Sequence, residues 1–121
     1  MPELPEVQTT VNGLQKIINK KIYNIEVYTI KLRYIVPKKI TYLVKNKKII
    51  RIFRIAKYII FQLSNDISLV FHLGMSGRIK LFKFINYKTT KHDHIKLNIS
   101  NHNIVVFNDP RKFGFVDISK T

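Results

Sequence analysis

The chain has 121 residues and a net charge of +15, because 22 lysines and arginines face 7 acidic residues, and this excess favours a polyanion such as nucleic acid as partner. Its length fits one domain, its 45% hydrophobic content argues against disorder, and its lack of cysteine excludes disulfides and thiolate metal sites. We expect a soluble, cytoplasmic protein, because no apolar stretch approaches about 18 residues, the N-terminus has acids where a signal peptide has bases, and no basic amphipathic helix suggests a membrane surface.

The first residues combine a proline, an acid and a helix start. Pro2 follows the initiator methionine. Removal of that methionine would leave Pro2 with a free secondary amine that titrates near pH 8 and is partly neutral, hence nucleophilic, at physiological pH. Glu3 places a carboxylic acid beside this amine, while Pro5 and Glu6 suit the first turn of a helix. The alternative interpretation is an exposed N-terminal arm followed by a helix.

Apolar residues at spacings of three and four, from Leu4 to Ile18, predict a helix of about four turns whose buried face holds the N-terminus against the domain. After residue 20 the pattern changes to short segments rich in Ile, Val, Phe and Tyr, separated by polar turns. The predicted strands are 21–30, 33–36, 48–56, 57–63, 67–73, 78–85, 94–99, 104–107 and 113–118, and residues 39–45 are a candidate short helix. One helix followed by many short strands predicts an α+β fold, mainly β: an antiparallel β-sandwich in a single domain, residues 1–121.

Two stretches of the strand region carry isolated functional groups. Lys57 lies between two apolar strands and is either a solvated strand-end lysine or a functional amine. Met75 lies in a loop between two glycines, which suits a loop tip better than a gap in the core.

A third stretch, residues 91–94, holds His92 and His94 two positions apart. In a strand the two side chains would share a face, and with His72 or His102 they would make a metal site conceivable. The shortage of carboxylates and the many lysines favour anion binding instead.

The fourth stretch is a turn at residues 108–114 that displays Arg111 and Phe113 together. Arginine pairs with phosphate or a base edge, and phenylalanine can wedge between stacked bases, so this turn suits insertion into nucleic acid.

Together with the N-terminus, these motifs occur in the same order and with similar spacing in a known family. The chain resembles the N-terminal domain of bacterial formamidopyrimidine-DNA glycosylase, a base-excision repair enzyme for oxidised purines, over essentially its whole length. The motifs that carry the resemblance are Pro2-Glu3-Leu4-Pro5-Glu6-Val7, Ala56-Lys57-Tyr58, His72 to Gly77, Lys91 to His94 and Asp109 to Gly114.

The resemblance implies a DNA glycosylase and abasic-site lyase acting in the cytoplasm, at the nucleoid, on double-stranded DNA with oxidised purines or abasic sites. Pro2 would attack C1′ of the damaged nucleotide and form a Schiff base. Glu3 would act as general acid and base at the deoxyribose, and Lys57 as proton donor in β-elimination. Glu6 would have a supporting role near the active site.

The resemblance also implies how DNA would be held. His92 and Arg111 would bind phosphates around the extruded nucleotide, and His72 is a weaker candidate for that role. Met75, Arg111 and Phe113 match the family residues that fill the space left by the flipped base.

The chain departs from the family pattern in two ways. Gln8 stands where the family usually has a glutamate. The family's helix–two-turn–helix module and four-cysteine zinc finger have no match in these 121 residues, so we expect no zinc or other cofactor in this chain. A separately encoded C-terminal half is one conceivable partner; otherwise we expect a monomer.

Three hypotheses follow from the sequence. The chain is an active glycosylase and lyase, whole or as one half of a split protein, or a truncated remnant that binds DNA without chemistry. The third is an unrelated anion-binding β-sandwich, which requires the motifs to be coincidental.

Overall fold

The computed structural model describes residues 3–120, and its chain begins with helix α1 (Leu4–Leu14). A single 3-10 turn, η1 (Gln15–Ile17), continues this helix, and Asn19 ends it in the left-handed conformation with φ 69°. Val7, Val11 and Leu14 are buried along one face, as the spacing of apolar residues predicts. The predicted helix is therefore confirmed, with its last turn tightened.

Within residues 3–120 eight strands follow the helix, together with a short helix α2 (Ile40–Val44) and a 3-10 turn η2 (Phe84–Asn86). The strands are β1 (Lys21–Val27), β2 (Lys47–Ile55), β3 (Tyr58–Leu63), β4 (Ile67–His72), β5 (Arg78–Lys83), β6 (Asp93–Ile99), β7 (Asn103–Asn108) and β8 (Phe115–Lys120).

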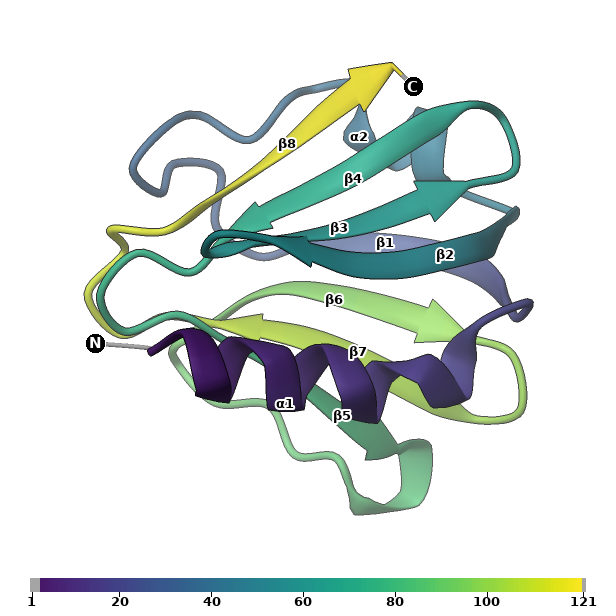
Figure 1. The fold of residues 1–121 in the computed structure, drawn as a ribbon. Helices are drawn as coiled ribbons and strands as arrows, with labels where there is room; N and C mark the ends of the chain where they lie inside the picture. The colour runs from purple at the N-terminus through teal and green to yellow at the C-terminus, as the bar shows by residue number, and fades with distance from the viewer. Residues whose placement is uncertain (1–2, 121) are drawn as a thin grey trace.

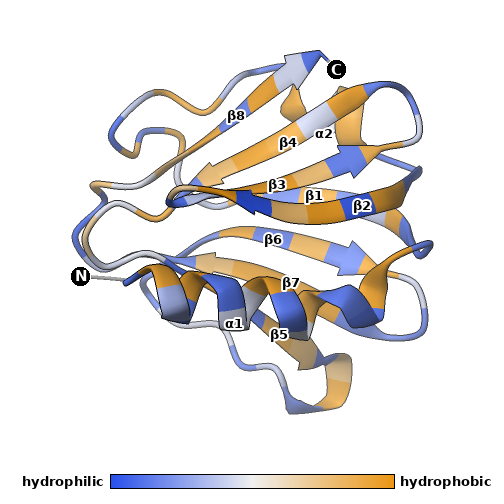
Figure 2. Ribbon diagram, in the orientation of Figure 1, coloured by the Kyte–Doolittle hydropathy of each residue, from blue (hydrophilic) through white to orange (hydrophobic). Residues whose placement is uncertain are grey.

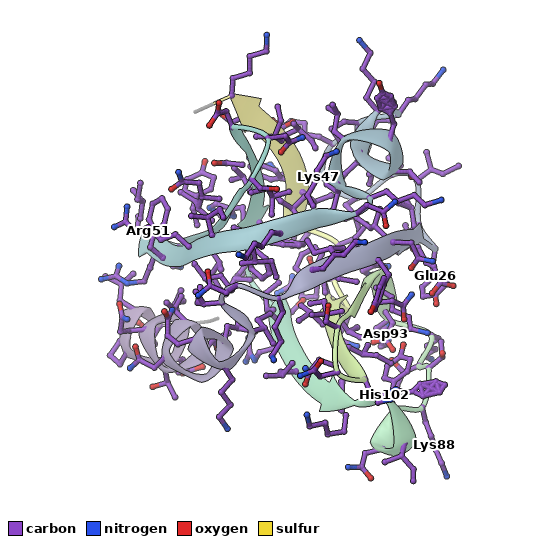
Figure 3. The ribbon with its side chains drawn as sticks, turned by 90° about the vertical axis from the view of Figure 1, so that its right-hand side faces the viewer. Glu26, Lys47, Arg51, Lys88, Asp93 and His102 are labelled. Carbon is purple, nitrogen blue, oxygen red and sulfur yellow. The ribbon has the colours of Figure 1, made fainter. Side chains whose placement is uncertain are left out.

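The strands form one antiparallel sheet in the order β5-β7-β6-β1-β2-β3-β4-β8. Its centre is a narrow seam, because β1 and β2 pair only near their ends, Lys21 with Lys48 and Ile22 with Lys47. The sheet divides there into two halves of four strands (Figure 1). Apolar side chains are buried between the halves, and Figure 2 marks the hydrophobic residues along the strands in orange. Charged side chains such as Arg51 on β2 lie at the surface (Figure 3). The expected mainly β fold with an N-terminal helix is confirmed.

The predicted strand at residues 33–36 is wrong. Val36 N–H donates to Ile30 O at 2.8 Å and Leu32 N–H donates to Tyr34 O at 3.1 Å, so this segment is a compact loop with one isolated bridge, Lys31 to Ile35. In a strand Leu32, Tyr34 and Val36 would share one face, but Leu32 and Val36 are buried while Tyr34 is exposed, so the alternation of a strand is absent. The candidate helix at 39–45 is confirmed as α2.

Two short connections cross between the halves of the sheet. Residues 73–77 join β4 to β5, and residues 109–114 join β7 to β8. Both lie at the end of the molecule where α1 begins (Figure 1, left).

Within residues 3–120, no helix combines the length and apolar character needed to cross a membrane.

Candidate active site

A buried carboxylate ties the two crossing connections together. Asp109, which is 0% exposed, accepts a hydrogen bond from Ser76 Oγ at 2.5 Å and another from Gly114 N–H at 2.8 Å. The Ser76 hydroxyl oxygen in turn accepts from Arg111 N–H at 3.0 Å. Segments separated by more than 30 residues in the sequence are thus joined through one side chain.

Two glycines allow the backbones of these connections to touch. Gly74 has φ +58°, and a Cβ at this position would lie 2.6 Å from Gly114 N and from Phe113 C. A Cβ on Gly114 would in turn overlap His72 O. Any larger residue at either position would therefore push the two segments apart.

Three side chains extend from the joined loops into solvent. Met75 is 40% and Phe113 44% exposed, and the Arg111 guanidinium lies 5.0 Å from the centre of the Phe113 ring. The loop-tip interpretation of Met75 is thus confirmed over the core interpretation. The loops hold one flexible apolar side chain, one guanidinium fork and one flat ring together, a combination suited to stacked bases and phosphates.

The two histidines before and in β6 have different environments. His94 is buried: its Nδ1 lies 2.7 Å from Thr29 Oγ1 and its Nε2 lies 2.7 Å from Asp109 O. His92 is only half-buried, and its carbonyl accepts Asp109 N–H at 3.0 Å. His94 therefore supports the 109–114 turn through Asp109, while His92 remains partly accessible to solvent.

The metal alternative finds no support in the geometry. Both ring nitrogens of His94 are already hydrogen-bonded, and His102 lies in the β6–β7 turn, at the opposite end of β6 from His92. Across residues 3–120 no group of three or more His, Asp or Glu side chains is arranged to hold a metal ion.

The loop that leads to His92 is shaped by Asp93. This carboxylate accepts hydrogen bonds from Tyr87 Oη at 2.8 Å, Asn108 Nδ2 at 2.8 Å and Thr90 N–H at 2.9 Å. Burial would raise the pKa of Asp93, but the hydrogen bonds from Asn108, Thr90 and Tyr87 outweigh it and lower this pKa below its usual value.

An aromatic edge lies beside the joined loops. Tyr58, His72 and Phe115 are cross-strand neighbours on β3, β4 and β8. The His72 ring stacks on Phe115 with centroids 5.2 Å apart, and its Nδ1 accepts Gly74 N–H at 3.0 Å. Burial, with the nearby charges of Arg33 and Lys57, lowers the pKa of His72 below 6.5, so at neutral pH this ring is an uncharged hydrogen-bond donor through Nε2.

Lys57 is presented by a tight turn. Ile55 pairs with Tyr58, so Ala56 and Lys57 are the two central residues of the β2–β3 hairpin, and Lys57 is half-buried. Its charge acts on His72, which places the amine near the aromatic edge.

The acidic residues predicted at the N-terminus lie at the start of α1. Glu3 is exposed and its carbonyl accepts Val7 N–H at 3.0 Å, the first helical bond of α1. Glu6 Oε2 lies 4.0 Å from Arg78 Nη2, where β5 leaves the 73–77 loop. Pro2 lies outside the described residues.

Comparison with known proteins identifies this arrangement. A family profile described as the formamidopyrimidine-DNA glycosylase N-terminal domain matches residues 1–116. The chain belongs to the formamidopyrimidine-DNA glycosylase family. It is 46% identical to the formamidopyrimidine-DNA glycosylase of Rickettsia africae, over 100% of this chain and 44% of that protein, and 44% identical to that of Rickettsia massiliae, over 100% and 43%.

Solved structures of the Lactococcus lactis formamidopyrimidine-DNA glycosylase have the same fold. A complex of a mutant of that protein with DNA containing Fapy-dG has a TM-score of 0.88 at 32% identity, covering 99% of this chain and 44% of that one. A non-covalent complex with DNA containing an AP site has a TM-score of 0.87 at 30% identity, covering 98% and 45%. The chain thus spans less than half the length of the formamidopyrimidine-DNA glycosylases that it matches.

Sequence reasoning gave no role to two residues of this glycosylase-family site. Arg33 N–H donates to Gly114 O at 3.2 Å, and the Arg33 charge acts on His72, but the residue was hidden in a segment predicted to be a strand. Asp109 was visible only as part of a turn motif. An acid at the head of a turn is a common backbone acceptor, which is the one local signal for its role.

Proposed function

We propose that this chain acts in base-excision DNA repair as a DNA glycosylase and abasic-site lyase that removes oxidised purines such as 8-oxoguanine and formamidopyrimidines. The observation that supports this proposal best is the Asp109-linked pair of loops, which displays Met75, Arg111 and Phe113 beside the edge that carries Lys57. The Lactococcus lactis relative binds DNA containing Fapy-dG or an AP site, which supports the same class of substrate here.

In the proposed first step, the secondary amine of Pro2, free of Met1, attacks C1′ of the damaged nucleotide. The C1′–N bond to the base breaks, and the base leaves with the bonding electrons and takes up a proton. Glu3 protonates the ring oxygen as the sugar opens, which leaves an iminium between Pro2 and C1′. Glu3 suits this exchange because its side chain is exposed at the start of α1, next to Pro2 in the chain.

In the second step the iminium withdraws electrons from C2′. Glu3, which has given its proton to the ring oxygen, takes the C2′ proton as base. The C3′–O bond then breaks, and the 3′ phosphate leaves with the bonding electrons, which cuts the strand. Lys57 donates the proton in this elimination and its charge stabilises the leaving phosphate. Lys57 lies in a tight hairpin turn, which limits the distance between its amine and the strand end.

The loops account for binding in this proposal. Met75 and Phe113 fill the space left by the extruded nucleotide and Arg111 bonds the orphaned base, so that the cost of a few kcal/mol for base flipping is offset. His92 and Arg111 hold phosphates, and neutral His72 contributes a hydrogen-bond donor. Glu6 supports the site by holding α1 near Arg78.

No cysteine lies in the 121 residues, so a four-cysteine zinc finger has no counterpart among them. We propose that residues 1–121 form one catalytic domain that contributes its own side chains to the steps above and acts in the cytoplasm. A separately encoded C-terminal half would supply the remaining DNA contacts, and in its absence the domain acts as a monomer.

Borohydride trapping tests this function. Duplex oligonucleotides with 8-oxoguanine or an abasic site are incubated with the chain and reduced, and a covalent DNA complex carrying the 14.3 kDa chain is expected on a denaturing gel. The matched control is the same chain with an uncleaved N-terminal tag, which acylates the Pro2 nitrogen and removes its nucleophilicity. No trapped complex from the processed chain on either substrate contradicts the catalytic proposal.

A second candidate function is DNA binding without chemistry. It is favoured by the net charge of +15, which attracts DNA phosphates whether or not the N-terminal amine reacts. Binding to damaged duplex with no trapped complex would support this candidate over the first.

A further inference from the structure

A chain of hydrogen bonds connects α1 to the turn that presents Lys57. Arg54, near the end of β2, donates through Nε to Gln8 Oε1 on α1 at 3.1 Å. The same guanidinium donates through Nη1 to Ala56 O, also at 3.1 Å. The helix that follows Pro2 and Glu3 is therefore bonded, through one arginine, to the residue directly before Lys57.

The turn at the end of this chain needs support. Ala56 has φ +50°, in the left-handed region that a two-residue hairpin turn normally fills with glycine. For alanine this conformation is unfavourable by about fivefold or more in population. The bond from Arg54 to the Ala56 carbonyl fixes the peptide that joins Ala56 to Lys57, and so holds the turn in this form.

The amide of Gln8 orients the arginine. Gln8 accepts from Arg54 through Oε1 and donates through Nε2 to Asn12 Oδ1 at 3.0 Å, one helical turn further along. Because both ends of the amide are used, its orientation is fixed. A glutamate at position 8 would keep the acceptor for Arg54 but would have no proton to donate to Asn12.

We propose that Gln8 and Arg54 are positioning residues that set the place of Lys57 relative to the N-terminal helix. This inference rests on the proposed function and assigns the two residues to one of its two chemical steps. The two residues act through the Ala56 turn on the elimination step, and they leave attack by Pro2 on C1′ unaffected. An ordinary surface contact between helix and sheet would instead affect both steps equally or neither.

The first test measures the turn and needs no activity. In the ¹⁵N-labelled chain, Arg54→Ala and Gln8→Ala should shift the amide resonances of Ala56 and Lys57 and change the φ-dependent coupling of Ala56. Thr9→Ala, at an exposed neighbouring position on α1, is the matched control and should leave both resonances in place. Gln8→Glu should return the Ala56 coupling close to that of the parent chain. Unchanged Ala56 and Lys57 resonances in Gln8→Ala and Arg54→Ala overturn the inference.

The second test separates the two chemical steps on a preformed abasic site. Arg54→Ala should reduce strand cleavage about fivefold while borohydride trapping stays within about twofold of the parent chain. Adding Ala56→Gly should restore most of the cleavage, because glycine adopts the left-handed turn without support. Gln8→Ala repeats the measurement if Arg54→Ala does not fold.

Equal loss of trapping and cleavage, or no rescue by Ala56→Gly, refutes the positioning role. If the parent chain itself gives no trapped complex, the proposed function fails. The resonance measurements still decide whether the hydrogen bonds from Gln8 through Arg54 to Ala56 hold the turn.

Discussion

Replacing Asp109 by alanine removes the side chain that joins the two crossing connections. Both its oxygens accept hydrogen bonds, from Ser76 Oγ and from Gly114 N–H, and the residue is fully buried. A hydrogen bond to a charged group contributes about 1.5–3 kcal/mol, so two of them set the expected loss of unfolding free energy at about 3–6 kcal/mol. Since small domains have about 5–15 kcal/mol in total, Asp109→Ala should remain folded only marginally.

Urea denaturation measures this loss, with Asp117→Ala as the control, because Asp117 is exposed and accepts its hydrogen bond from the N–H of its neighbour Ile118. The control should stay within about 0.5 kcal/mol of the parent chain. Binding to a duplex with a stable abasic analogue should weaken more than binding to undamaged duplex, because the loops that carry Met75 and Phe113 separate. A loss below about 1 kcal/mol, or equal loss on both duplexes, would refute the linking role of Asp109.

Three further predictions concern pH, salt and the displayed side chains. The folded-state pKa of His72 lies below its ordinary 6.5, so unfolding free energy should fall as pH drops through and below about 6.5, and His72→Gln should flatten that dependence; identical pH profiles would contradict it. The logarithm of DNA affinity should fall linearly with the logarithm of salt concentration, and Arg111→Ala should reduce the slope by about one; a slope unchanged by Arg111→Ala argues against its phosphate contact. Met75→Ala with Phe113→Ala should change stability by less than about 0.5 kcal/mol yet weaken binding to lesion duplex by about 1–3 kcal/mol per side chain, as titration of labelled duplex would show.

The sequence predicts the elements well where burial is periodic. Val7, Val11 and Leu14 recur at helical spacing, and the helix is there. The strand prediction for residues 33–36 is wrong because the apolar side chains there do not alternate between a buried and an exposed face. Tyr34 and Ile35 are adjacent and both exposed, and the segment is a loop that packs on the core through Leu32 and Val36. Composition cannot distinguish such a loop from a strand.

The candidate site is predictable in its displayed residues but not in its supports. Met75, Arg111 and Phe113 stand out because glycines and turn residues surround them in the sequence. Neither the pairing of Ser76 with Asp109 nor that of Gln8 with Arg54 leaves a local signal, because the partners are 33 and 46 positions apart and meet only when the strands pair. The different fates of His92 and His94 depend likewise on Asp109 and Thr29, which approach from other parts of the chain.

The narrow seam between β1 and β2 has a kinetic consequence. With so little pairing there, the two halves of the sheet are held in register largely by their shared core and by the connections 73–77 and 109–114. Ser76 in one connection and Asp109 in the other are 33 residues apart, so the contact between the two connections forms late in folding, after each half has formed its own hairpins. A ligand that binds both loops would hold them together and so oppose separation of the two halves of the sheet. Occupancy should therefore slow unfolding of the whole chain, and the halves should open first at the end where the loops lie.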